Sequence, residues 1–160
     1  MIEGRDSALN KLKAALADDR QWTDILDSVD ELIKIHLAVF VEPYFTFISE
    51  GKKSIETRFS KNRIAPFECI EKGDIILLKR SGAGIAGVCV VDQVWFYHLL
   101  PGSLDQIKEQ FGRGICPSNS DFWDARQSAS YCSLIWITSF RSFEDIPFKK
   151  SDRRGWVILK

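Results

Sequence analysis

The sequence has few of the residues that usually build metal sites. Its 160 residues include 2 histidines and 4 cysteines, and no two cysteines form a Cys-x-x-Cys pair. The cysteines are Cys69, Cys89, Cys116 and Cys132. Because structural zinc sites need four ligands at short, paired spacings, the sequence predicts no metal site. We recognise no signal peptide, and we therefore expect a cytoplasmic protein with reduced thiols.

The sequence also lacks a net charge and a long apolar run. Lys+Arg number 22 and Asp+Glu number 22, so the formal net charge is +0. Proteins that coat nucleic acid without sequence preference are usually basic, so any nucleic-acid contact here must come from a local patch and be modest and salt-sensitive. No apolar stretch approaches the roughly 20 residues of a membrane-spanning helix, so we expect no membrane partner.

The residues that are present indicate one globular domain of mixed structure. Apolar residues make up 45% of the chain, enough for a core at this length. Short strand-like runs alternate with single helices and no repeat is visible, which favours an α+β mixed barrel over a doubly wound sheet. Two amphipathic helices come first, over residues 7–18 and from Thr23, the expected cap, to Ile33. They are too short for their own core, so we predict a helical extension, 1–34, packed on a domain, 35–160.

Several runs predict strands by their β-branched and aromatic content. They cover residues 36–41, 54–59, 74–79, 88–98, 131–140 and 156–159. We expect Trp136 in the core and Trp156 near the surface, beside a basic turn.

Gly82–Gly87 matches the pattern G-x-G-x-x-G, but a β-branched run follows it, so it predicts a hairpin loop and no dinucleotide cofactor. Ile2–Arg5 matches a protease site common in engineered fusions, and we assign it no structural role.

The stretch Gly51–Arg58 carries the chemistry. Gly51 suits the left-handed turn after a helix. A strand that begins at Ser54 directs Glu56 and Arg58 to one face, and Lys53 lies just before its start. Arg58 offers a planar fork for phosphate or carboxylate, and Lys53 is a point charge or, if desolvated, a base or nucleophile. Glu56 would orient either cation or take a proton from water. The alternative is a solvated, ion-paired strand face worth under about 1 kcal/mol.

The pattern Gly-x-Lys-x-x-Glu-x-Arg in this stretch resembles the signature of the ASCH domain family. The Gly73-Asp74 turn and the segment from Phe122 to Phe140 extend the resemblance to about residues 35–160. Membership implies a PUA-like β-barrel with flanking helices and a cleft at the motif. Similar domains are described as RNA-binding modules, as ribonucleases and as amidohydrolases of acylated cytidine. The amidohydrolases have threonine where this chain has Glu56, so the acyl-threonine route is not matched.

Basic and aromatic residues together favour RNA, or a nucleotide, as the partner, because RNA-binding sites combine cations with stacking rings. The candidate binding residues are Lys52, Lys53, Arg58, Arg63, Arg153, Arg154 and Trp156. The alternative function is a small metal-independent hydrolase of a modified nucleoside or of RNA, with Lys53 and Glu56 as catalytic residues. A third hypothesis is a protein-interaction module that binds a partner through the N-terminal helices.

Overall fold

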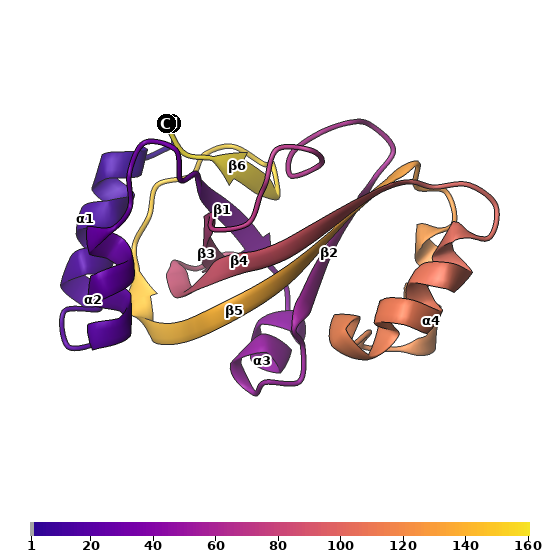
Figure 1. The fold of residues 1–160 in the computed structure, drawn as a ribbon, viewed down its shortest axis with the longest axis horizontal. Helices are drawn as coiled ribbons and strands as arrows, with labels where there is room; N and C mark the ends of the chain where they lie inside the picture. The colour runs from indigo at the N-terminus through magenta and orange to yellow at the C-terminus, as the bar shows by residue number, and fades with distance from the viewer. Residues whose placement is uncertain (1) are drawn as a thin grey trace.

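The computed structural model describes residues 2–160, and its strands form one curled sheet with helices around it (Figure 1). The helices are α1 (Arg5–Ala15), α2 (Arg20–Asp27), α3 (Tyr44–Ser49) and α4 (Ser103–Ile115), with the short 3₁₀ turns η1 (Ser120–Phe122) and η2 (Asp124–Arg126). The strands are β1 (Ile35–Phe40), β2 (Ile55–Ser60), β3 (Ile75–Arg80), β4 (Ile85–His98), β5 (Tyr131–Ile146) and β6 (Trp156–Ile158). Within the described range, no helix has the length and apolarity needed to cross a membrane.

The sheet has the strand order β2-β5-β4-β3-β1-β6. Strand β1 runs parallel to β3, and the other neighbours are antiparallel. Three register shifts interrupt the β4–β5 pairing, and such bulges bend a strand pair. In Figure 1 this long pair crosses the molecule from α1 and α2 to α4. The predicted α+β class and curled mixed sheet are confirmed, with β2 and β6 as its two edges.

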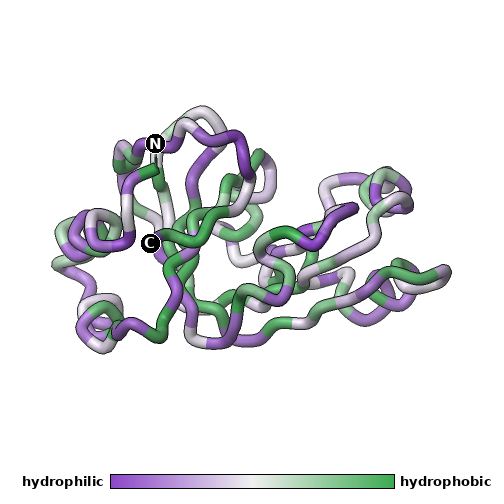
Figure 2. The backbone as a smooth tube through the Cα atoms, turned by 90° about the horizontal axis from the view of Figure 1, so that it is seen from above, coloured by the Kyte–Doolittle hydropathy of each residue, from purple (hydrophilic) through white to green (hydrophobic). Residues whose placement is uncertain are grey.

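The central strands are buried on both faces. Ile35 and Leu37 of β1 belong to an apolar cluster beneath α1 and α2, whereas Ala38 and Phe40 belong to a second cluster inside the curl. Because side chains alternate along a strand, a continuous apolar run such as Ile75–Leu78 supplies both clusters. Figure 2 shows these hydrophobic segments running through the middle of the molecule.

The N-terminal helices cover one face of the sheet. Leu12, Trp22 and Leu26 are at most 3% exposed and share a cluster with Leu37. The Trp22 indole also donates a hydrogen bond to the carbonyl of Ser139 at 2.9 Å. The apolar stripe of these helices is therefore covered by the sheet, and a protein partner would have to bind their polar outer faces.

Two details at the N-terminus differ from the sequence prediction. Helix α2 begins at Arg20, and its cap is Asp19 rather than Thr23, because the Asp19 carboxylate accepts the backbone N–H of Trp22 at 3.0 Å. The earlier start turns the large Trp22 ring toward the sheet, and its burial outweighs the local capping preference of Thr23. Glu3 does have a structural role, because its carboxylate accepts a hydrogen bond from Lys11 Nζ at 2.6 Å.

Two tryptophans lie in environments opposite to those predicted. Trp136 is 43% exposed, because from this residue on β5 no longer has both faces buried, and the Trp136 side chain lies on the exposed face. Trp156 is only 4% exposed, because β6 pairs with β1 and its indole packs inside the curl. The glycine-rich stretch does begin in a hairpin loop between β3 and β4, as predicted.

Helix α4, the turn η1 and the following Trp123 form a third apolar cluster against β2 and the far end of the β4–β5 pair. Gly114 makes this close approach possible. A Cβ at Gly114 would lie 2.9 Å from Ile55 Cδ1, so a larger residue would push α4 away from β2. The contact brings the carbonyl of Ile115 beside Lys53, which connects this cluster to the candidate site.

Candidate functional site

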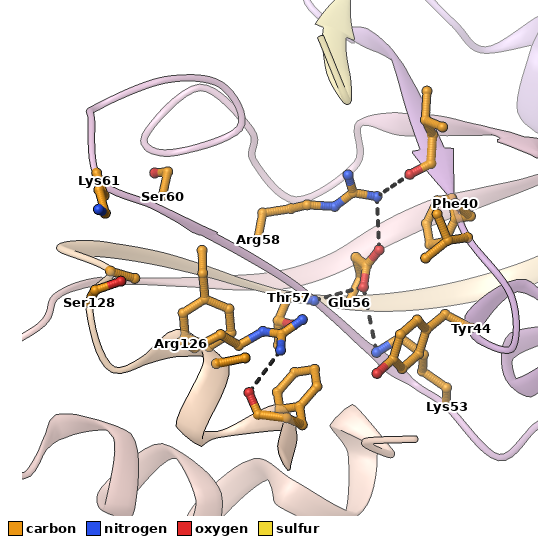
Figure 3. Close-up of a pocket in the computed structure, with 16 residues that line it drawn as sticks. Phe40, Tyr44, Lys53, Glu56, Thr57, Arg58, Ser60, Lys61, Arg126 and Ser128 are labelled. Atoms are coloured by element: carbon orange, nitrogen blue, oxygen red, sulfur yellow. Dashed lines mark hydrogen bonds and ion pairs between the residues drawn. The ribbon is translucent and has the colours of Figure 1, made fainter. Parts of the chain in front are cut away.

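A cleft of about 620 Å³ runs along β2. Its other walls come from the end of β1, from α3 and from residues 119–129, which we call the η segment (Figure 3). Its aromatic lining consists of Phe40, Tyr44, Phe59 and Phe122. Its charged lining consists of Lys53, Glu56, Arg58, Lys61 and Arg126. Four cations thus face one carboxylate in a chain of formal net charge +0, so the cleft concentrates positive charge.

Lys53 lies buried at the inner end of the cleft. Gly51 makes the predicted left-handed turn after α3, with φ of 76°, and the chain then enters β2. Lys53 Nζ donates to the carbonyls of Ile55 and Ile115, both at 2.7 Å, and lies 3.5 Å from Glu56 Oε1. Two of the three N–H donors of the ammonium are therefore engaged by carbonyls, and the Glu56 carboxylate balances its charge. Burial lowers the pKa of Lys53 below its usual range, and the Glu56 carboxylate opposes that shift.

Glu56 is the counter-charge of the buried cations. Its Oε1 accepts the backbone N–H of Thr57 at 2.9 Å, and its Oε2 accepts a guanidinium N–H of Arg58 at 3.0 Å. Burial alone would raise the pKa of Glu56, but the charges of Arg58 and Lys53 outweigh it and hold the pKa below its usual range. Glu56 is therefore an ionised acceptor and a weak base. Figure 3 shows its carboxylate between the two cations.

Arg58 closes the seam between the two edges of the curled sheet. Strand β2 is one edge, and β1 with β6 forms the other. From β2, Arg58 Nη2 donates to the carbonyl of Val39 on β1 at 2.9 Å, and Nη1 donates to the carbonyl of Gly155 at 3.3 Å. Its guanidinium carbon lies 5.1 Å from the Phe40 ring centre and 5.0 Å from that of Trp156. Arg58 is therefore held by hydrogen bonds and aromatic rings, and not poised free in the cleft.

A buried hydrogen-bond chain supports the Trp156 ring beneath Arg58. The Trp156 indole donates to His36 Nδ1 at 3.0 Å, and His36 Nε2 lies 2.9 Å from Asp74 Oδ2. Asp74 also accepts the backbone N–H groups of Lys34 and Glu71, both at 3.1 Å. These bonds assign His36 a neutral ring that donates from Nε2 and accepts at Nδ1. The Gly73-Asp74 turn thus anchors, through His36 and Trp156, the floor on which Arg58 rests.

Arg126 was not a predicted site residue, and its setting differs from that of Arg58. It projects from the η segment, and its guanidinium carbon lies 3.5 Å from the Phe122 ring centre and 5.5 Å from that of Phe59. Nη1 donates to the carbonyl of Phe122 at 2.8 Å. Among residues 2–160, no carboxylate forms an ion pair with Arg126 or with Lys61. Burial lowers the pKa of Arg126, and the electrostatic effects of Tyr44 and Glu56 partly oppose that shift.

The other predicted binding residues do not line the cleft. Lys52 pairs with Glu50 at 3.2 Å, Arg63 pairs with Glu68, and Arg154 pairs with Asp152. Arg153 is exposed on the turn before β6. Trp156 offers no open stacking face, because it is buried under Arg58. Lys52, Arg63, Arg153 and Arg154 therefore do not join Lys53 and Arg58 in one binding surface around the cleft.

Sequence reasoning also missed two polar residues of the cleft. Tyr44 lies over Lys53, with Nζ 5.2 Å from its ring centre, and its hydroxyl lies 2.9 Å from Ser118 Oγ. Ser128 lines the opposite end of the cleft. Tyr44 precedes the family motif and the η segment has no motif, so no local signal separated these residues from their neighbours. Among residues 2–160, no group of three or more His, Cys, Asp or Glu side chains is arranged to hold a metal ion.

Comparisons with known proteins identify the relatives of this chain. A model of the ASCH domain family matches residues 39–147. The crystal structure of ASCH from Zymomonas mobilis superposes with a TM-score of 0.63 at 12% identity, covering 79% of this chain and 88% of that one. A Tyr-to-Phe mutant of that protein gives a TM-score of 0.62 at 12% identity, covering 79% and 91%. At this identity the structural likeness shows the fold alone. A comparison with curated proteins finds no match.

Proposed function

The chain belongs to the ASCH domain family, and from that premise we propose that its cleft binds one nucleotide of a single-stranded RNA. The observation that carries the proposal is the combination of aromatic rings with an excess of cations in one cleft. Single-stranded RNA is recognised by stacking its bases on aromatic rings and by neutralising its phosphates. The cleft offers both kinds of contact within one nucleotide-sized volume.

Glu56 supplies a polar contact for the base. A carboxylate has about four lone-pair sites, and Thr57, Arg58 and Lys53 occupy three of them. The remaining site on Oε2 can accept the amino or imino N–H of a base edge. Tyr44, whose ring is only partly buried, lines the same cleft beside that position and can stack on the base.

The neutral overall charge predicts weak, local binding. Only cleft cations contribute, because Lys52, Arg63 and Arg154 are paired with acids outside it. For single strands, the slope of log affinity against log salt is about −0.7 for each phosphate contact. Two or three contacts predict a slope of roughly −1.4 to −2.

Filling the cleft tests this function without touching a charge. Ala125 and Ala129 line the cleft, so the double variant Ala125→Leu/Ala129→Leu should weaken binding of a fluorescent single-stranded RNA at least tenfold in anisotropy titrations. The matched control is Ala14→Leu/Ala83→Leu, with both residues exposed, on α1 and in the β3–β4 loop. No binding by the wild type, or equal binding by the filled variant, would contradict the proposal.

A second candidate is metal-independent hydrolysis of RNA or of an acylated cytidine. It is favoured by the buried Lys53–Glu56 pair, since a desolvated lysine with a lowered pKa is typical of catalytic sites. It is opposed by the Glu56 carboxylate beside Lys53, which favours the charged ammonium, and an ammonium has no lone pair for attack on a substrate. Incubation of both substrates with wild-type protein and a chelator tests it. Intact substrates after long incubation would remove this candidate.

A further inference from the structure

The two arginines of the cleft differ in the hydrogen bonds they have left to form. Arg58 donates to Glu56, to the Val39 carbonyl and to the Gly155 carbonyl, and it lies between two rings. A phosphate would have to displace these partners. Arg126 donates only to the carbonyl of Phe122 among the described residues. A guanidinium has five N–H donors, so most of those of Arg126 are available to a ligand.

The surroundings of Arg126 hold its charge in place without neutralising it. Phe122 and Phe59 lie against the guanidinium, and the bond to the Phe122 carbonyl fixes its plane. Figure 3 shows the side chain crossing the cleft from the η segment toward β2. A half-buried cation with no carboxylate partner is costly in the free protein, and a bound anion relieves that cost.

Three further polar residues of the cleft lining also suit an anion. Lys61 follows the end of β2, and Ser60 and Ser128 line the same end of the cleft. Glu56, the carboxylate of the lining, lies four residues before Ser60 on β2, so the backbones of these two residues are roughly 13 Å apart at the usual rise of a strand. Along β2 the acid and Lys61 are therefore separated, and the Arg126 guanidinium lies between them, beside Thr57 (Figure 3).

We propose that Arg126 is the phosphate-binding residue of the cleft, and that a nucleotide lies with its phosphate at Arg126 and Lys61 and its base toward Glu56. This inference rests on the proposed function and adds an orientation and a specificity to it. A planar guanidinium can bind two oxygens of one phosphate at once, whereas the Lys61 ammonium acts as a point charge. The site should therefore prefer phosphorylated ligands over the corresponding nucleosides.

Titrations with labelled single-stranded RNA at several salt concentrations test this assignment. We expect Arg126→Gln to weaken binding about tenfold and to reduce the salt slope by about 0.7, the contribution of one phosphate. Arg126→Lys should keep the slope and recover part of the affinity. Arg20→Gln, an exposed arginine at the start of α2, is the matched control and should bind like the wild type. Unchanged affinity and slope in Arg126→Gln would overturn the assignment.

A second readout separates this inference from the proposed function. Inorganic phosphate at millimolar concentration should raise the Tm of the wild type above its value in sodium chloride of equal ionic strength. Arg126→Gln should lose that rise, and Arg20→Gln should keep it. If the wild type binds no RNA but shows the Arg126-dependent rise, the RNA function fails and the anion site stands. An equal rise in Arg126→Gln, or none in the wild type, would overturn the anion site.

Discussion

Arg58 and Arg126 are the same residue type in one cleft, and the structure uses them differently. Arg58 is the inner cation, bonded to a carboxylate and to two carbonyls at the sheet seam. Arg126 is the outer cation, stacked on Phe122 and without an acid partner among residues 2–160. Only the first of these lies in the family motif. The comparison indicates that the motif residues build the cleft, and that a residue outside the motif supplies its cation without an acid partner.

The inner group behaves as one unit. Lys53, Glu56 and Arg58 bond to one another and to the backbone of β1, β2 and α4. A family motif that looks like a set of binding residues is therefore first a way to hold α4 and the opposite edge of the sheet against β2. In the proposed function, its contribution to a ligand is the remaining acceptor site of Glu56, which lines the cleft. The following predictions separate the inner group from the outer cation.

The largest effect should follow removal of the buried ammonium. Lys53→Met leaves Glu56 less compensated and leaves the Ile55 and Ile115 carbonyls without their donor. Breaking a buried ion pair on one side costs about 3–5 kcal/mol in the free energy of unfolding. Urea denaturation at neutral pH measures this loss. The neighbouring control, Lys52→Met, removes an exposed pair and should stay within about 1 kcal/mol; equal losses in the two variants would refute the distinction.

Replacement of the seam arginine should have the next largest effect. Arg58→Lys keeps the charge but cannot span Glu56, Val39 and Gly155 with one planar group. Charge-assisted hydrogen bonds contribute about 1.5–3 kcal/mol each, so we expect a loss of about 2 kcal/mol in the free energy of unfolding. Hydrogen exchange at the amides of β1 and β6 should rise as the seam loosens. Full stability in Arg58→Lys would mean that charge alone holds the seam.

Acid should weaken the inner group. The pKa of Glu56 is lower in the folded protein than its ordinary value of 4.5, so its stabilisation is present above that pH and lost as the pH falls through the folded pKa. The unfolding free energy of the wild type should therefore decline below pH 4.5, and that of Glu56→Gln should decline less steeply. Glu3, whose pKa is lowered to about 2 by Lys11 and other hydrogen bonds, titrates in the same window. The comparison is therefore made between variants that both carry Glu3→Gln, and equal slopes would count against the Glu56 assignment.

The smallest effect on stability is expected at the outer cation. Arg126→Gln loses a ring contact worth about 0.5–1 kcal/mol but also removes a half-buried charge without a carboxylate partner. The two terms oppose each other, so the unfolding free energy should change by under about 0.5 kcal/mol. The same urea titration used for Lys53→Met measures this. A loss above about 2 kcal/mol would assign Arg126 to the structural group instead.

The sequence predicted the parts of the site that depend on near neighbours. The turn at Gly51 and the common face of Glu56 and Arg58 follow from backbone preferences and the two-residue period of a strand. The strand order and the seam did not follow, because they depend on contacts between distant segments. For the same reason the predicted positions of Trp136 and Trp156 were wrong. Burial of a ring depends on which layer covers each face, and composition alone does not reveal that.

The sequence by itself determined the α+β class, the family motif and the identity of the charges that meet on β2. Only the tertiary structure decided that these charges already have hydrogen-bond partners within the fold, whereas the charge of Arg126 has no acid partner among residues 2–160. The carbonyls of Val39, Ile115 and Gly155 reach Lys53 and Arg58 from other elements, and Arg126 enters the cleft from a segment about 70 residues away along the chain. Which groups form a hydrogen bond depends on their distance in space and not on their distance along the chain. The residue type therefore determines the charge, and the folded surroundings determine whether that charge is held by other residues or is available to a ligand.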